Sequence, residues 1–216
     1  MSFRSFTARS VGVATARAAV GSVRRFPRHG VAGLVMMLVG WVSAWMPTHP
    51  LSAGSFILLW VGFIFAVDEL VLWRRGTSLW QDHRWKFAQL FLFSVPVWWL
   101  FEALNMRVQN WHYILDKPYG YQWTSLTYNL MATACFSTVL PAVMEVASFL
   151  TSFALLRPRL AAHEAEPAVP DGWLALEFGG GAFMIVAPLI WPHVAFGLIW
   201  LGPLLLLDAI NAANHR

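Results

Sequence analysis

The chain has 216 residues, of which 58% are hydrophobic and 12% are charged, and its formal net charge is +4. Soluble domains carry about 25% charged residues, so the composition excludes an ordinary soluble domain and indicates an integral membrane protein. The single cysteine, Cys135, excludes an intrachain disulfide.

The first 29 residues form a basic segment ahead of the apolar part of the chain. This segment contains six arginines and no acidic residue, and it lacks the apolar core of a secretory signal. We expect a cytoplasmic tail or a helix on the membrane surface, attracted by anionic headgroups. An organelle transit peptide is the alternative. No folded basic module accompanies the segment, so nucleic acid is not an expected partner.

Six apolar runs follow, at or near the length of about 20 residues that a transmembrane helix needs. They lie near residues 30–47, 52–73, 86–107, 126–156, 173–191 and 194–213. We expect the first and fifth helices to be short. The fourth is overlong and contains Pro141, so we expect either a kink or an extension along the membrane interface. The sequence therefore predicts an all-α, polytopic protein in which residues 30–216 form a domain of six transmembrane helices.

The basic residues predict how these helices are oriented. With the N-terminus inside, 13 of the 15 Lys and Arg residues fall on the inner side, and only Arg107 and Lys117 fall outside. This bias is the one described by the positive-inside rule. We therefore expect both termini in the cytoplasm, and location in a bacterial inner membrane.

Two segments of the chain resemble each other: LWVGFIFAVDEL (59–70) and IWLGPLLLLDAI (199–210). At the same spacing, Trp60, Gly62 and Asp68 align with Trp200, Gly202 and Asp208. The alignment predicts that helices 1–2 and 5–6 are a degenerate repeat with parallel copies.

The aligned acids, Asp68 and Asp208, fall near the inner ends of their predicted helices. One interpretation is that they bond to neighbouring helices or reach water, since acids near helix ends cost less than acids at the bilayer centre. The other is that they form an inner acidic cluster together with Glu69 and Glu177.

The stretch WWLFEALNMRVQNWHY (98–113) turns from apolar to polar near the end of the third predicted helix. Trp98, Glu102 and Asn105 share one helical face. An acid at a helix centre costs roughly 2.5–3.5 kcal/mol, so we take Glu102 and Glu145 as candidate functional acids. Burial favours the neutral acid, which can donate a proton. The alternative is hydrogen bonding between helices. The candidate catalytic residues are Glu102, Asn105 and Glu145.

The order of residues after Glu102 has a parallel in a known family. Arg107 follows at five residues, Trp111 at nine and Tyr113 at eleven, and a later predicted helix bears LPAVME (140–145). Over residues 86–150 this order resembles the membrane-embedded lycopene cyclase domain. Two features differ, since Glu102 stands where that family has Asp, and LPAVME contains one acid where the family has a pair.

The resemblance implies a membrane enzyme that protonates an isoprenoid, a carotenoid or another lipid, with Glu102 and Glu145 as acid and base. It also implies that π faces of aromatic residues meet carbocation character in the substrate. The candidate substrate-binding residues are Trp98, Trp99, Arg107, Trp111, His112 and Tyr113.

Two other functions are open at this point. The chain is alternatively an accessory subunit of a membrane complex that binds pigment or quinone, or a small transporter coupled to protons or cations. No metal site or cofactor is expected, because His49, His112 and His193 follow no recognised ligand spacing. The expected partners are the lipid bilayer, a hydrophobic small molecule and other membrane proteins.

Overall fold

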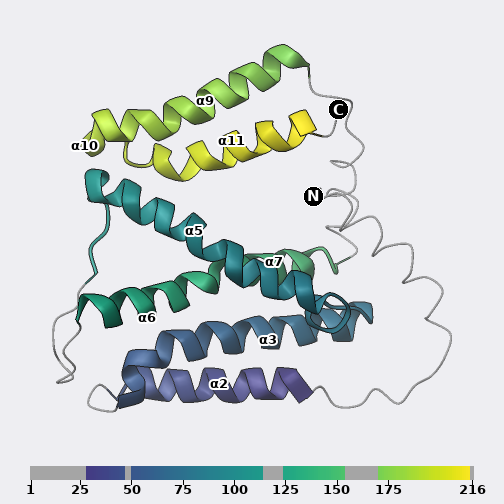
Figure 1. The fold of residues 1–216 in the computed structure, drawn as a ribbon. Helices are drawn as coiled ribbons and strands as arrows, with labels where there is room; N and C mark the ends of the chain where they lie inside the picture. The colour runs from purple at the N-terminus through teal and green to yellow at the C-terminus, as the bar shows by residue number, and fades with distance from the viewer. Residues whose placement is uncertain (1–27, 47–49, 114–123, 154–169, 215–216) are drawn as a thin grey trace. The chain divides into compact units, whose positions relative to one another are not determined.

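The computed structural model describes residues 28–46, 50–113, 124–153 and 170–214 (Figure 1). Within these ranges the regular structure is helical and no strand occurs, so the all-α prediction is confirmed. The helices are α2 (Arg28–Ala44), the 3-10 helix η1 (Pro50–Gly54), α3 (Ser55–Arg75), α4 (Leu79–Asp82), α5 (Arg84–Val108), α6 (Ser125–Ser137), α7 (Val139–Leu150), α9 (Asp171–Ile190), α10 (Pro192–Ala195) and α11 (Leu198–Asn214).

Among the described residues, four helical segments are long and apolar enough to cross a membrane: Leu51–Arg75, Arg84–Val108, Ser125–Leu150 and Asp171–Ile190. They match the second to fifth predicted spans, and they make the chain a helical membrane protein. Two shorter apolar helices, α2 and α11, match the first and the sixth. The fifth helix is not short as expected, since it has 20 residues. The sixth is short because the separate turn of α10 takes up its first residues.

The helices belong to two compact units. The first, here called the N-terminal unit, contains α2, α3, α4, α5 as far as Trp99, α6 and α7. The second, the C-terminal unit, contains the end of α5 from Leu100 with the following residues to Tyr113, and α9, α10 and α11.

In the N-terminal unit, α2 and α3 pack side by side as the first hairpin (Figure 1). Their backbones meet at two glycines, because a Cβ on Gly33 would lie 2.6 Å from the carbonyl oxygen of Gly62. The reverse distance, from a Cβ on Gly62 to the carbonyl oxygen of Gly33, is also 2.6 Å. Small residues allow such approach between membrane helices, and any side chain here would push the two backbones apart.

In the C-terminal unit, α9 and α11 pack side by side as the second hairpin (Figure 1). Here Gly181 and Gly202 meet, and a Cβ on either would lie 2.9 Å from the carbonyl oxygen of the other. The sequence FGGGAF thus supplies a glycine to close helix packing, as its small residues predict.

The predicted irregularity in the fourth span lies between α6 and α7, three residues before Pro141. The side chain of Ser94 on α5 enters this break. Its hydroxyl donates to the carbonyl of Phe136 at 2.5 Å and accepts the backbone N–H of Leu140 at 3.1 Å. Ser94 is 1% exposed, so it satisfies two backbone groups that the broken helix leaves unpaired inside the protein.

Candidate functional site

The polar stretch at the end of α5 folds into a tight turn. Gln109 follows the last helical residue with φ of 51°, in the left-handed region that commonly ends a helix. The side-chain oxygen of Asn105 accepts the backbone N–H of Asn110 at 2.9 Å and that of Trp111 at 3.3 Å. Its amide nitrogen donates to the carbonyl of Trp111 at 2.9 Å. Asn105, a predicted catalytic residue, thus fixes the path of the turn.

The turn brings two aromatic donors to Glu102. Its Oε1 accepts a hydrogen bond from Trp111 Nε1 at 3.2 Å and another from the hydroxyl of Tyr113 at 2.5 Å. The residues that the structure describes provide no hydrogen bond to the other oxygen, Oε2. Glu102 is half-buried. One carboxyl oxygen is therefore held and oriented by two aromatic side chains.

A stack of aromatic rings adjoins Glu102 within the C-terminal unit. The ring of Trp111 lies 5.3 Å from that of Trp200 on α11, and Trp200 stacks on Phe101 at 5.0 Å with an interplanar angle of 20°. In the sequence, Trp200 was identified as part of the repeat and was not predicted to be a site residue. Its place beside Glu102 depends on how α11 packs, which local sequence does not reveal.

The other predicted substrate-binding residues lie elsewhere. Trp98 and Trp99 pack on Phe136 of α6, and Trp99 Nε1 also donates to the hydroxyl of Thr133 at 3.1 Å. Arg107 Nε donates to the carbonyl of Leu189 in α9 at 3.0 Å. His112 is exposed. The predicted set is thus divided, because Trp111 and Tyr113 donate to Glu102, whereas Trp98 and Trp99 pack on Phe136 and Arg107 bonds to Leu189.

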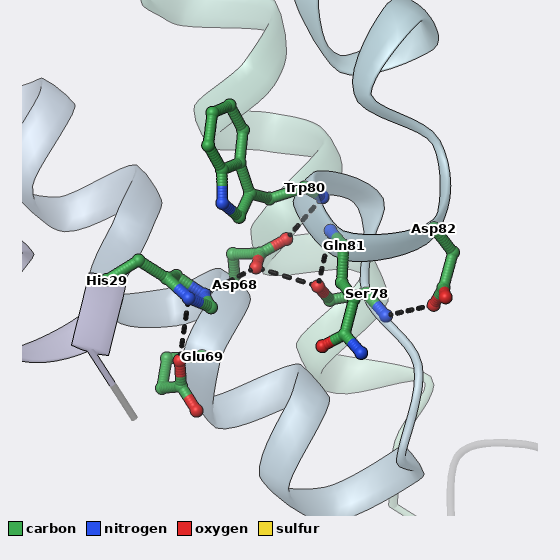
Figure 2. Close-up of polar contacts among 7 residues, drawn as sticks. All are labelled: His29, Asp68, Glu69, Ser78, Trp80, Gln81 and Asp82. Carbon is green, nitrogen blue, oxygen red and sulfur yellow. Dashed lines mark hydrogen bonds and ion pairs between the residues drawn. The ribbon is translucent and has the colours of Figure 1, made fainter. Parts of the chain in front are cut away.

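A second polar centre lies near one end of the first hairpin, where Asp68 is completely buried (Figure 2). Asp68 Oδ2 accepts the hydroxyl of Ser78 at 2.8 Å and lies 2.9 Å from His29 Nε2. Its Oδ1 accepts the backbone N–H of Trp80 at 2.9 Å. Three groups from α2 and from the start of α4 therefore converge on one carboxyl of α3.

Local structure explains why α4 supplies two of these contacts. Ser78 is the N-cap of α4, and its side chain accepts the backbone N–H of Gln81 at 3.2 Å (Figure 2). The first N–H groups of a helix have no partner inside the helix. That of Trp80 therefore points out of α4 and is free to bond to Asp68.

His29 links Asp68 to a second acid. Its Nδ1 lies 2.9 Å from Glu69 Oε2, while its Nε2 contacts Asp68 (Figure 2). The His29 side chain is 21% exposed, whereas the Asp68 side chain is not exposed. His29 therefore stands between the buried acid and the surface of the unit.

Glu145 on α7 completes this centre. It is completely buried, α7 packs against α3, and the Glu145 carboxyl interacts with that of Asp68. Neither oxygen of Glu145 has a hydrogen-bond donor in the described part of the chain. His29, Asp68, Glu69 and Glu145 are together called the carboxylate cluster below.

From the sequence, Asp68 and Glu69 were predicted to belong to an inner acidic cluster, Glu145 was predicted to act with Glu102, and His29 was not predicted to take part in a site. A signal for His29 does exist in the sequence. His29 comes four residues before Gly33, and Glu177 comes four residues before Gly181. In the second hairpin Glu177 interacts with Asp208, just as His29 contacts Asp68 in the first.

Glu102 and Glu145, the predicted acid and base, belong to different units. Over the described ranges, no group of three or more His, Cys, Asp and Glu side chains is arranged to hold a metal ion. Comparison of the chain with protein-family models, curated proteins and solved structures finds no match.

Proposed function

We propose that the chain is an integral membrane enzyme that uses Glu102 as a general acid on a lipid-soluble polyene, such as an isoprenoid or a carotenoid. One observation carries the proposal. The side chains nine and eleven residues after Glu102, which the lycopene cyclase resemblance singles out, both donate to its carboxyl group. Aromatic rings from α5 and α11 adjoin the same site.

The hydrogen bonds suit a carboxylic acid that donates from a defined atom. Oε1 accepts from Trp111 and Tyr113 and so acts as the carbonyl oxygen, which leaves the acidic hydrogen on Oε2. Transfer of this proton to a carbon–carbon double bond forms a C–H bond from the π electrons and leaves a carbocation and the Glu102 carboxylate. The same two donors then stabilise the carboxylate, and neighbouring ring faces stabilise the cation.

If the product is a ring, an internal double bond first attacks the cation. An adjacent carbon then loses a proton to the Glu102 carboxylate, which forms the new double bond and restores the acid for the next turnover. These steps consume no net proton and need no oxidant or reductant.

The test is expression in cells that accumulate linear polyenes, followed by chromatographic profiling of the lipid extract. General acid catalysis contributes about 10²–10⁴-fold to a rate, so Glu102→Gln is expected to lower product formation by about 10²-fold or more. Tyr113→Phe removes one donor to Oε1 and is expected to cause a smaller loss. Asp171→Asn, an equivalent acid-to-amide change at the start of α9, serves as the control.

Two results would contradict the proposal. One is a lipid profile for the wild type that matches cells without the protein, across a panel of acyclic isoprenoids and carotenoids. The other is full product formation by a correctly inserted Glu102→Gln protein.

For the topology, we infer six transmembrane helices with both termini in the cytoplasm of a bacterial inner membrane. The four long apolar segments and the two shorter ones support the number, and the distribution of Lys and Arg supports the orientation. Reporter fusions after Arg75, Lys117 and Arg216 test this. Fusions at Arg75 and Arg216 are expected to report the cytoplasm, and the fusion at Lys117 the opposite side.

We also infer that helices 1–2 and 5–6 descend from a duplicated hairpin. In each hairpin two glycines lie opposite each other where the helices pack. In each hairpin, one ionisable residue comes four positions before the first glycine and its partner comes six positions after the second glycine. These pairs are His29 with Asp68, and Glu177 with Asp208. This shared register extends the match beyond the residues aligned from the sequence.

That register favours a second candidate function, a transporter coupled to protons or cations, because repeated hairpins with ionisable groups are common in transporters. Proteoliposomes with a pH-sensitive dye inside provide the test. Coupled transport predicts substrate-dependent proton movement that Asp68→Asn abolishes, and a lipid-modifying enzyme predicts none.

A further inference from the structure

The strongest observation outside the Glu102 site is the environment of Glu145. Its carboxyl is completely buried, and the described residues offer no donor to either oxygen. An ionised carboxylate without a partner in such a place would carry a large desolvation cost. The group that interacts with it is the carboxyl of Asp68, which offers only acceptor oxygens when it is ionised.

Two ionised carboxylates buried together lose their hydration and repel each other, so burial favours a proton on one of them. The oxygens of Asp68 accept from the hydroxyl of Ser78 and the N–H of Trp80, and Asp68 also contacts His29. Glu145 has no such donor in the described part of the chain. The proton therefore belongs on Glu145.

His29 connects this buried pair to the surface of the unit. Its Nε2 lies 2.9 Å from Asp68 Oδ2, and its Nδ1 lies 2.9 Å from Glu69 Oε2. The His29 side chain is 21% exposed, whereas the Asp68 side chain is not exposed. A proton from outside the unit can therefore reach Asp68 by way of His29.

The basic side chains nearby have partners other than Glu145. Arg74 and Arg75 bond to the hydroxyls of Ser152 and Thr151 beyond the end of α7, and the Arg84 guanidinium lies 5.1 Å from the centre of the Trp80 ring. Asp82 accepts the backbone N–H of Ser78. The titratable or charged groups on the helices of the N-terminal unit, besides Glu145, are Arg28, His29, Asp68, Glu69, Arg74, Arg75, Asp82, Arg84, Lys86, Tyr128 and Cys135.

We propose that the carboxylate cluster is a proton-binding site in which Glu145 holds an exchangeable proton, and that this proton reaches the surface through Asp68 and His29. Transfer from Glu145 to Asp68 leaves the Glu145 carboxylate, and Asp68 then protonates a neutral His29 or returns the proton. His29 is the partly exposed member of this chain of contacts, so it is where protons enter and leave.

The experiment is infrared spectroscopy of the full-length protein in lipid nanodiscs, because a protonated carboxylic acid has a carbonyl-stretch band distinct from that of a carboxylate. We expect such a band at neutral pH, with a component that shifts in D₂O. Glu145→Gln is expected to abolish this component. Glu102→Gln is the comparison, and it is expected to leave the component in place.

Replacement of Glu145 by Gln keeps the shape of the neutral acid and supplies an N–H to Asp68, so the variant is expected to fold. If it does not insert, Glu145→Asp takes its place and is expected to shift the frequency of the same component. Two results would show that Glu145 does not hold the proton. One is the absence of the component in the wild type, and the other is its unchanged presence in the Glu145 variant.

The route is tested by the rate at which the component shifts after transfer to D₂O. His29→Gln is expected to slow the exchange and to leave the band present. An unchanged exchange rate in a folded His29→Gln protein would overturn the role of His29 as the point of proton entry.

Discussion

Three consecutive glycines in α9 allow a matched test of close helix packing. Gly181 lies at the contact with α11, while the adjacent Gly180 faces open space. The variants Gly181→Ala and Gly180→Ala add the same methyl group to neighbouring positions of one helix. We expect the two changes to alter stability in opposite directions.

The magnitude follows from the distances at each position. A Cβ on Gly181 would lie 2.7 Å from the backbone nitrogen of Leu206, where ordinary contact begins at 3.4 Å, so α9 and α11 must separate by 3.4 − 2.7 = 0.7 Å. Such overpacking costs about 1–3 kcal/mol, against a gain of about 0.5–1 kcal/mol for Ala over Gly within a helix. At position 180 no heavy atom lies within 4 Å of the added Cβ, so only the gain remains.

The assay is unfolding of the purified protein in a mild detergent, followed by the fluorescence of its 13 tryptophans. The free energy of unfolding is expected to fall by about 1–2 kcal/mol in Gly181→Ala and to rise by up to about 1 kcal/mol in Gly180→Ala. If Gly181→Ala is as stable as Gly180→Ala, then the close contact of α9 with α11 is wrong.

Two further changes test other local features by the same unfolding assay. Ser94→Ala removes the hydroxyl that bonds to a backbone carbonyl and a backbone N–H at the α6–α7 break, and it is expected to lower the free energy of unfolding by about 1–3 kcal/mol. The control is Ser137→Ala, which removes a hydroxyl bonded within its own helix. An equal loss in both variants would refute the bridging role of Ser94. Gln109 has a left-handed backbone conformation, which glycine adopts at a lower energetic cost. Gln109→Gly is therefore expected to raise the free energy of unfolding by about 1 kcal/mol. A loss of that size would show instead that the Gln109 side chain stabilises the turn.

Much of the fold could be predicted because it depends on local sequence and composition. Apolar runs of about 20 residues form helices in a bilayer, since each backbone N–H and C=O must be satisfied within the segment. The irregularity near Pro141 also follows from local chemistry, because proline removes a helical hydrogen bond. The residue that fills the break could not be predicted in this way, because Ser94 comes from another helix.

The two candidate sites differ in the same way, since one depends on local sequence and the other on contacts between helices. Glu102, Trp111 and Tyr113 lie within twelve residues, so one turn held by Asn105 brings them together, and their spacing in the sequence was a sufficient clue. The carboxylate cluster joins side chains from α2, α3 and α7. All three of its acids stand out in the sequence, but nothing local shows that Glu145 joins Asp68 and Glu69, because local sequence does not specify which helices pack together.

By itself, the sequence determined that this chain is a helical membrane protein with several costly acids in its apolar segments. Only the tertiary structure decided which of those acids share a site, and which of three adjacent glycines meets another helix. The physical reason is the range of the interactions. Burial in lipid and backbone hydrogen bonding act on each segment separately, whereas the pairing of Glu145 with Asp68 exists only after α3 and α7 have packed.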